Sequence, residues 1–398
     1  MKNDKGGYIF MINYPLAADT WDDEEYNAIN RVIKSNRFTI GPEVEMFEKE
    51  FAKYFGSEHA VMVNSGSSAN LIAISALILS DKYDLNHGDE VIVPAVSWAT
   101  TYTVLHQCGL KLRFIDIDLN TFNLDLKELK NAITDDTKAV FAVNLLGNPN
   151  DFNELISICE ENDLILIEDN CESMGAKYHG KYAGTFGVCG TFSTFYSHHM
   201  ATMEGGMILT DDDELNDIMK SIRSHGWTRN LSEDSPFNTK KDKFYEMFNF
   251  IFPGYNVRPV EMEAAIGREQ LKKLDGFLKE RKSNGKYFLD LFSNVDYISV
   301  QKNQDDSSFF GFPLIFKDES ERKKFIDVCD ENNIEYRPIV AGNFTKNKVI
   351  EYFDYTIHGE LTNSNILHNN GLFIGNHHFD VRKELDEIYE LLIKSIGE

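Results

Sequence analysis

The chain has 398 residues, of which 42% are apolar, so it is long enough for a large core and for two closely joined domains. Its 40 basic and 64 acidic residues leave a formal net charge of −24, which disfavours nucleic acid or an anionic membrane surface as the main partner. The five cysteines lack paired spacing, which argues against a disulfide framework.

The N-terminus has only a few apolar residues before Asn13, fewer than the apolar region of a signal peptide needs. No run of about 18 apolar residues, the length that a membrane-spanning helix requires, occurs in the sequence. We therefore expect a soluble, cytoplasmic protein.

The chain alternates between helical and strand-like patterns, which predicts a mostly parallel sheet with helices on both faces. We expect a large domain over residues 1–269 and a small α/β domain over residues 270–398. Helices are predicted at 21–35, 44–55, 69–79, 124–132, 153–162 and 261–280. Strands are predicted at 60–63, 90–93, 111–117, 139–144, 164–168, 207–210, 308–315 and 335–338.

The turn Asn64-Ser65-Gly66-Ser67-Ser68 joins a predicted strand to a predicted helix. Backbone amides at such a turn, together with the positive end of the helix, can bind a phosphate group. A serine that only caps the helix explains the same residues without any ligand.

Trp98 follows the second predicted strand. A single tryptophan is more often part of a hydrophobic core than of a binding site, because large aromatic side chains dominate protein interiors. From its position alone we therefore expect Trp98 to be buried in the core.

The apolar strand that begins at Ile165 is followed by three acids, Glu168, Asp169 and Glu172. Carboxylates at the end of a buried strand indicate that a cation receives at least one of them. The alternative is that they are solvated loop acids, which is what we expect for Glu168.

Two later segments are informative only by their spacing. In the first, His198 stands five residues after Ser193 and six before Glu204, which begins a Glu-Gly-Gly string. The second, Gly254-Tyr255-Asn256-Val257-Arg258, precedes a predicted helix and taken alone is an ordinary loop.

In this order, the five segments resemble the DegT/DnrJ/EryC1/StrS aminotransferase family. Gly41-Pro42 followed by Phe47-Glu48 fits the family's N-terminal pattern as well, so the resemblance covers nearly the whole chain. It implies a fold of the aspartate aminotransferase-like type (fold type I), with a mostly parallel seven-stranded sheet in the large domain. It also implies a pyridoxal 5′-phosphate (PLP) cofactor and a homodimer with shared active sites.

The resemblance assigns cofactor contacts to particular residues. Gly66, Ser67 and Ser193 are implied to bind the phosphate, and Asn256 is implied to reach the phosphate of the neighbouring subunit.

Contacts to the cofactor ring are implied for three further residues. Trp98 would stack on the ring, and Asp169 would keep the ring nitrogen protonated. Many members carry glutamine near the phenolic oxygen, where this chain has Glu172.

The chain departs from the family pattern at the lysine that binds PLP covalently, which is replaced by His198. An imidazole cannot form a stable imine, but it can transfer protons. In this it resembles the sugar 3-dehydratases of the family. Some of those use an iron–sulfur cluster held in part by a C-x-C string, which this chain lacks, so the resemblance implies the kind without an iron–sulfur cluster.

The resemblance therefore implies a PLP- and pyridoxamine phosphate-dependent dehydratase. It would remove the C3 hydroxyl of a GDP-linked 4-keto-6-deoxy sugar, with His198 as catalytic proton carrier, L-glutamate as amino donor and release of ammonia. A diphosphate substrate requires cationic groups, for which the candidates are Arg229, Arg258 and Arg337. The resemblance implies His225 as a further residue of the substrate site. As a single histidine, His225 is about equally well explained by a structural role.

Three alternatives stay open at this point. A plain sugar aminotransferase would need a lysine at position 198. A regulator with this fold and no catalytic activity could lack that lysine, but it would have little reason to retain Asp169, Trp98 and His198 together. A different 4-keto nucleotide sugar is the strongest alternative, because only the resemblance selects GDP over another nucleotide.

Overall fold

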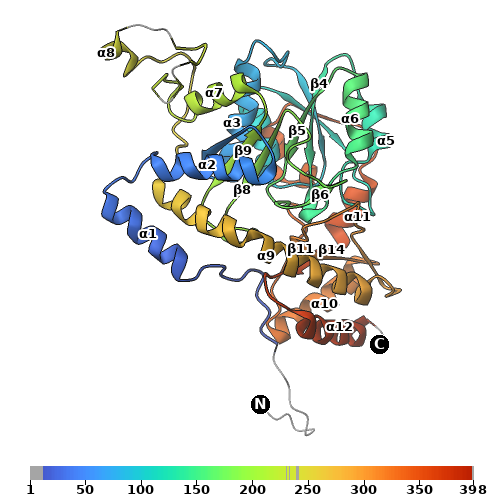
Figure 1. Cartoon of the computed structure of the whole chain (residues 1–398). Helices are drawn as coiled ribbons and strands as arrows, with labels where there is room; N and C mark the ends of the chain where they lie inside the picture. The colour runs from blue at the N-terminus through green and yellow to red at the C-terminus, as the bar shows by residue number, and fades with distance from the viewer. Residues whose placement is uncertain (1–11, 230, 233, 239–241, 397–398) are drawn as a thin grey trace.

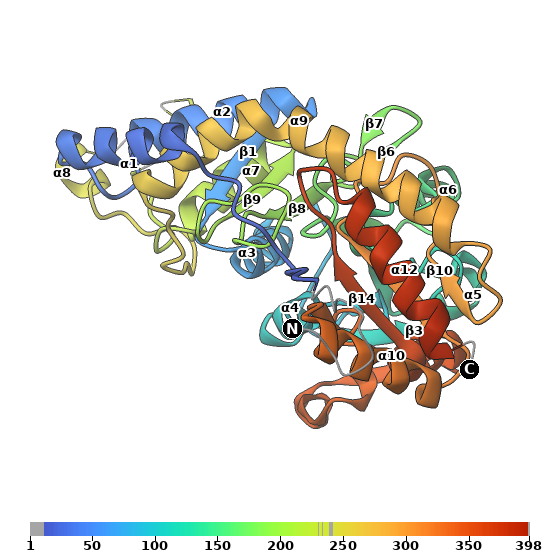
Figure 2. The ribbon, with the colours of Figure 1, turned by 90° about the horizontal axis from the view of Figure 1, so that it is seen from below.

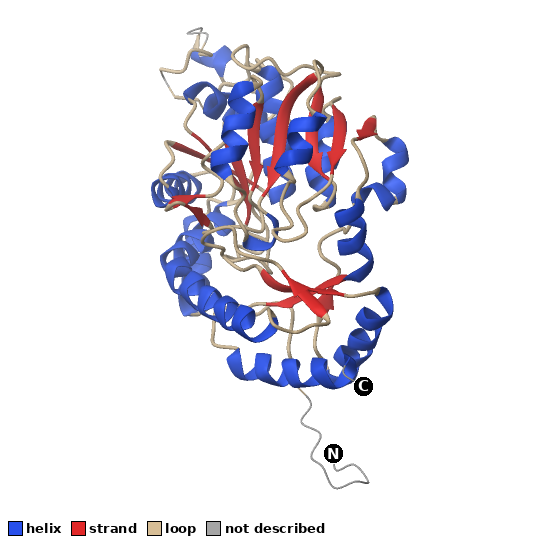
Figure 3. Ribbon diagram, turned by 90° about the vertical axis from the view of Figure 1, so that its right-hand side faces the viewer, coloured by secondary structure: helices blue, strands red, loops and turns tan. Residues whose placement is uncertain are grey.

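The computed structural model describes residues 12–229, 231–232, 234–238 and 242–396 (Figure 1). Residues 1–11, on which the expectation about a signal peptide depends, lie outside these ranges. The described chain contains a large sheet and a smaller sheet, which lie one above the other in Figure 3.

The large sheet is built from strands whose neighbours are mostly parallel. Its described strands are β1 (His59–Val63), β2 (Glu90–Pro94), β3 (Lys111–Ile115), β4 (Thr137–Val143), β5 (Ile165–Asp169), β8 (Cys189–Ser193), β9 (Gly206–Thr210) and β13 (Tyr355–Ile357). These eight strands lie in the order β1-β9-β8-β5-β4-β2-β3-β13. Only β9 runs against its neighbours, β1 and β8. The predicted mostly parallel sheet is therefore confirmed.

The sheet has one strand more than the implied seven. The additional strand is β13, which pairs in parallel with β3 and places Tyr355 opposite Leu112. It comes from the part of the chain that was assigned to the small domain. Its three residues are too few to give a readable periodicity, and it lies at the edge of the sheet, where Thr356 and Ile357 are exposed.

Helices cover both faces of this sheet, because successive side chains of a buried strand point to opposite sides. In β2, Val91 and Val93 pack with helices on one face, while Ile92 packs on the other. On the first face lie α3 (Gly66–Leu79), α4 (Ala99–Gln107) and α7 (Asp213–Ile222). On the second face lie α5 (Leu126–Ala132) and α6 (Phe152–Glu161).

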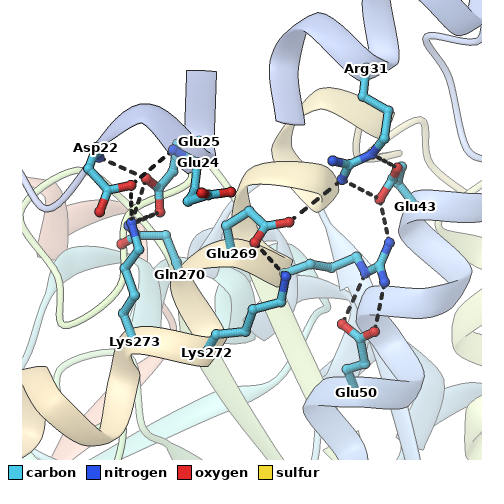
Figure 4. Close-up of polar contacts among 11 residues, drawn as sticks. Asp22, Glu24, Glu25, Arg31, Glu43, Glu50, Glu269, Gln270, Lys272 and Lys273 are labelled. Atoms are coloured by element: carbon cyan, nitrogen blue, oxygen red, sulfur yellow. Dashed lines mark hydrogen bonds and ion pairs between the residues drawn. The ribbon is translucent and has the colours of Figure 1, made fainter. Parts of the chain in front are cut away.

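The long helix α9 (Glu261–Phe292) connects the two sheets and extends well beyond the predicted range of 261–280. Two N-terminal helices, α1 (Asp23–Ser35) and α2 (Pro42–Phe55), lie beside it. Ion pairs help to hold them there. Lys273 lies 2.7 Å from Glu25 (Figure 4), and Arg268 lies 2.7 Å from Glu43. No described helix, α9 included, has both the length and the apolar character needed to cross a membrane.

The smaller sheet is antiparallel and contains β10 (Ile298–Val300), β11 (Gly311–Phe316), β14 (Gly371–Gly375) and β12 (Tyr336–Arg337) in that order. It packs against the end of α9, α10 (Glu319–Asn332) and α12 (Arg382–Ile396). Figure 2 shows α12 alongside β14. The remaining described elements are α8 (Lys243–Glu246), α11 (Thr362–Asn370), the hairpin β6 (Lys177–Tyr178) and β7 (Lys181–Tyr182), and the short 3-10 helices η1 (Leu145–Gly147), η2 (Phe344–Lys346) and η3 (Lys348–Tyr352).

Three features cross the predicted domain boundary at residue 269. Helix α9 runs through it without a break, and β13 returns to the large sheet. The N-terminal Tyr14 joins the core of the small sheet, where its hydroxyl donates to the carbonyl of Gly375 at 2.8 Å. The two-domain division stays a prediction. The two predicted domains are in contact or continuous at these three places.

Candidate active site

A cavity of about 830 Å³ lies where the carboxyl ends of β1, β2, β5 and β8 face the small sheet. Ligands of open α/β sheets bind at this edge, because the loops that follow parallel strands converge there. Among the described residues that line the cavity are eight of those predicted from the sequence: Gly66, Ser67, Trp98, Asp169, Glu172, Ser193, His198 and Arg337. The described lining contains no lysine.

One end of the cavity can receive an anion. Ser65 caps α3 by accepting a hydrogen bond from the backbone amide of Ser68 at 3.1 Å, so the capping interpretation is correct for this serine. The cap leaves Gly66 and Ser67 as the first residues of the helix, where backbone amides have no partner within the helix. A Cβ at Gly66 would lie 2.6 Å from the Cβ of Ser193. Glycine thus allows the Ser193 side chain to lie across the start of α3, as a phosphate site requires.

Asp169 also lines the cavity and is 6% exposed. Its Oδ2 accepts hydrogen bonds from Asn70 Nδ2 at 2.9 Å and from Thr101 Oγ1 at 2.8 Å. Its Oδ1 accepts one from the backbone amide of Cys171 at 3.2 Å. All three donors are neutral, so they orient the carboxylate without neutralising its charge. A protonated ring nitrogen is a group that would complete this site.

Trp98 is 58% exposed and lines the cavity from the start of α4. The expectation of a core tryptophan is therefore wrong. An exposed indole ring in a cavity offers a flat apolar face on which another aromatic ring can stack.

The two glutamates near Asp169 differ in their roles. Glu168 is completely buried and accepts hydrogen bonds from the backbone amides of Gly184 and Phe186, both at 2.6 Å, and of Gly187 at 2.8 Å. The expectation of a solvated loop acid was wrong, because this carboxylate holds a turn of the chain in place. Burial nevertheless raises the pKa of Glu168.

Glu172 faces the cavity. Its Oε2 accepts a hydrogen bond from the backbone amide of Leu146 at 3.2 Å. Burial, with a smaller contribution from the charge of Asp169, raises the pKa of Glu172 to about 7. The side chain can therefore either accept or donate a proton near neutral pH.

His198 lies in the same cavity, in contact with two phenylalanine rings. Its ring centroid is 5.9 Å from that of Phe195 and 5.2 Å from that of Phe310. Nδ1 is buried without a hydrogen-bond partner among the described residues, so Nε2 is the nitrogen that can face a ligand. Burial, and then the positive charge of Arg281, lower the pKa of His198 to about 4. The imidazole is therefore neutral near pH 7 and can accept a proton.

Four of the predicted residues do not line the cavity of their own chain: His225, Arg229, Asn256 and Arg258. They gather around Trp227 instead. The guanidinium groups of Arg229 and Arg258 lie 5.6 and 5.8 Å from the centre of its ring. Arg258 Nε also donates to Asn256 Oδ1 at 3.0 Å. Their role in the active site of a second subunit stays a prediction.

The sequence analysis assigned no role to several residues that shape the site. Asn70 could have been found, because it lies four residues after Gly66 and therefore on the same face of α3. Thr101 lies one turn after Trp98 in the same way. Phe310 and Arg281 carry no local signal, because they come close to His198 only through the packing of the small sheet and α9.

Comparison with known proteins agrees with this geometry. The DegT/DnrJ/EryC1/StrS aminotransferase family matches residues 19–392. The GDP-4-keto-6-deoxy-D-mannose 3-dehydratase of Yersinia pseudotuberculosis is 54% identical over 389 residues, which cover 96% of this chain and 99% of that protein.

Two solved structures are similar over the same length. One is a GDP-4-keto-6-deoxymannose-3-dehydratase with a trapped PLP–glutamate geminal diamine, at 54% identity and a TM-score of 0.93, covering 96% of this chain and 100% of that chain. The other is a mutant of such an enzyme with bound GDP-perosamine. It is 54% identical, has a TM-score of 0.93, and covers 96% of this chain and 100% of that chain. The expected aminotransferase-type fold is therefore confirmed.

Proposed function

The chain belongs to the DegT/DnrJ/EryC1/StrS aminotransferase family, and from this premise we propose that it is a nucleotide-sugar 3-dehydratase. It is a hydro-lyase that removes the C3 hydroxyl of GDP-4-keto-6-deoxy-D-mannose and yields GDP-4-keto-3,6-dideoxy-D-mannose. L-glutamate is the amino donor, and ammonia is released.

The residues in the cavity fit the PLP and pyridoxamine phosphate cofactor. The start of α3 and Ser193 would bind its phosphate, Trp98 would stack on its ring, and Asp169 would hold its protonated ring nitrogen. When bound, this cofactor supplies an electron sink that allows a carbon–oxygen bond next to a former keto group to break. The remaining chemistry belongs to the side chains of the protein.

One observation carries the proposal: a histidine lies in a cavity whose residues fit PLP and whose described lining contains no lysine. Because an imidazole cannot form a stable imine, the residues of this cavity would hold the cofactor through non-covalent contacts only. A residue that kept only a structural role at position 198 would not need a ring nitrogen that faces the cavity.

His198 is placed to accept on Nε2 a proton from the carbon that the bound cofactor would activate, and to give it to the departing C3 hydroxyl, which leaves as water. Its lowered pKa keeps the ring neutral near pH 7, makes it a weaker base than a free imidazole in the first transfer, and makes the protonated ring a stronger acid in the second. Glu172, with a pKa of about 7, can exchange a proton with a ligand on the same side of the cavity.

The substrates are anionic, and their binding uses cationic groups of two subunits. Arg337 is the only arginine in the described lining of the cavity. We therefore propose a homodimer in which Asn256 completes the partner's phosphate site, with Arg258, Arg229 and His225 beside the partner's substrate. Exposed aromatic side chains next to this cluster, such as Phe248 at 66% and Phe250 at 56%, favour an interface there.

The choice of nucleotide rests on the relatives, whose names and ligands include GDP. An assay of ammonia release with glutamate and a panel of 4-keto-6-deoxy sugars linked to GDP, CDP, UDP or dTDP tests it. The GDP-linked sugar should give the highest kcat/KM. Preference for another nucleotide would overturn the substrate assignment, and no ammonia with any of them would overturn the dehydratase.

We also propose that the protein acts in the cytoplasm. Its five cysteines are all free, as in a reducing compartment, and its proposed substrates are small, charged metabolites.

A further inference from the structure

Arg281 is a buried cation that has no counter-ion among the described residues. It lies on α9, is 4% exposed and keeps its charge at neutral pH, since burial lowers its pKa only to about 10. Its Nη1 donates to the carbonyl of Phe310 at 3.3 Å, and its Nε has no partner among the described residues. No described carboxylate forms an ion pair with it.

Another buried arginine shows the usual arrangement. Arg223 is 3% exposed, forms an ion pair with Glu48 and also donates to the carbonyl of Met62. Burying a charge is costly unless a partner of opposite charge compensates it. Arg281 has no such partner among the described residues. An unpaired buried charge of this kind indicates a functional role, so the groups around Arg281 have to be considered.

Arg281 is connected to two histidines through one shared neighbour. Its hydrogen-bond acceptor, Phe310, contacts the rings of both His198 and His199, at centroid distances of 5.2 and 5.7 Å. Burial first, and the positive charge of Arg281 second, lower the pKa of each of these histidines. The same two causes lower the pKa values of His377 and His378.

No other charge takes over this role at His198. On its own loop, the carbonyl of Phe195 and the neutral ring of His199 face it. The segment before β11 contributes the apolar ring of Phe310. None of the described carboxylates forms an ion pair with His198. The charged groups on the remaining walls of the cavity are Asp169, Glu172, Glu204, Glu335 and Arg337.

We propose that Arg281 is a positioning residue that keeps the His198 ring neutral and makes its protonated form short-lived. The inference rests on the proposed dehydratase function. There, His198 has to accept a proton from carbon and then give it up to the departing hydroxyl, so that the two leave together as water. A fixed positive charge nearby keeps the ring neutral before the first transfer, makes it a weaker base in that transfer, and favours the loss of the proton in the second.

The test compares three variants of the full-length protein. Arg281→Met removes the charge and keeps an apolar side chain of similar length, and Arg281→Lys keeps the charge. Lys282→Met is the matched control, because Lys282 is the next residue of α9 but its charge is already paired with Asp306 at 2.6 Å. NMR titration of histidine-labelled protein, with His198→Asn to assign the signal, reports the pKa of His198 without any need for turnover.

We expect the pKa of His198 to rise by about 0.5–1 unit in Arg281→Met, since burial, the larger cause, remains. The acidic limb of the kcat profile should shift to higher pH by the same amount. Arg281→Lys and Lys282→Met should leave both unchanged. An unchanged titration in a folded Arg281→Met protein would overturn the inference.

The experiment distinguishes a folding defect of the variant from a loss of the proposed role of Arg281. Replacing an unpaired buried charge with an apolar side chain is often neutral or stabilising, so Arg281→Met should melt no lower than the wild type. If it does not fold, the Arg281→Gln variant provides the same comparison. A wild type that releases no ammonia refutes the proposed function, whereas an active wild type with an unshifted profile in Arg281→Met refutes only the role of Arg281.

Discussion

Asn70 donates a hydrogen bond to Asp169 at 2.9 Å, although the two residues are 99 positions apart in the chain. Asn70 lies one turn after Gly66 on α3, so a single helix presents its first amides to the cavity and also orients the carboxylate of Asp169. The spacing between Gly66 and Asn70 is set by the rigid rise of a helix rather than by loops. A flat cofactor with a phosphate on one side and a ring nitrogen on the other matches this arrangement.

The first prediction concerns this carboxylate. Asp169→Asn keeps the size of the side chain and removes its charge, so PLP should bind about 10–100-fold more weakly. Absorbance titration of the apo-protein with PLP measures the change. Thr101→Val removes only one neutral donor to Asp169 and should weaken binding less. Equal affinity for Asp169→Asn and the wild type would show that the ring nitrogen lies elsewhere.

The second prediction is that PLP can be removed without breaking a covalent bond. Because His198 replaces the lysine, borohydride reduction of the PLP-loaded protein followed by intact mass spectrometry should show no pyridoxyl adduct. Dialysis alone should release the cofactor. A stoichiometric adduct on any lysine would contradict the non-covalent site.

The third prediction is that His198→Asn retains cofactor binding but loses dehydration. The change removes the titratable base, which typically costs ~10²–10⁴ in rate, and a residue that serves two proton transfers should fall in the upper part of that range. Ammonia release at saturating PLP measures it. His198→Lys should also stop dehydration, because a lysine can trap the cofactor covalently. Near-normal turnover of His198→Asn would mean that the base is another residue.

The fourth prediction concerns the pH dependence of stability through Glu172. Its pKa is raised from 4.5 to about 7, so between these values the folded apo-protein retains a proton that the unfolded chain has released. Stability due to this group is therefore present below pH 4.5, is lost as the pH rises, and is fully lost above pH 7.

Glu172→Gln removes this loss. We compare the free energy of unfolding of the variant with that of the wild type at pH 5 and at pH 8. The difference in favour of the variant should be about 1–3 kcal/mol larger at pH 8 than at pH 5. Urea denaturation of both apo-proteins at the two pH values gives the comparison. A stability difference that does not depend on pH would exclude the raised pKa.

The fifth prediction is that the active unit is a homodimer with shared sites. His198→Asn and Asn256→Asp should each be inactive alone. After mixing, unfolding and refolding in equal amounts, about a quarter of wild-type activity should return, because half of the dimers are hybrid and each hybrid has one intact site. Light scattering should show a dimer. An active monomer, or no recovery in a proven hybrid, would contradict the shared site.

The elements that could be predicted from the sequence are those whose signals lie within a short segment of the chain. The helices α1, α2, α3 and α6 and the strands β1, β2 and β4 lie within a few residues of their predicted bounds, because hydrophobic periodicity and caps are properties of short segments. Strand β13 and helix α4 were not predicted. β13 is three residues long, and its place in the sheet depends on pairing with β3, which lies more than 200 residues earlier.

The chemical identity of the site was determined by the sequence alone, because it depends on which residue type stands at which spacing: a serine turn, Trp98, Asp169, and a histidine where the family has lysine. The tertiary structure decided what each of these side chains can do. Burial and electrostatic interactions act through space between residues far apart in sequence. For that reason only the folded chain could make Glu168 a buried anchor, expose Trp98, and place the charge of Arg281 next to His198.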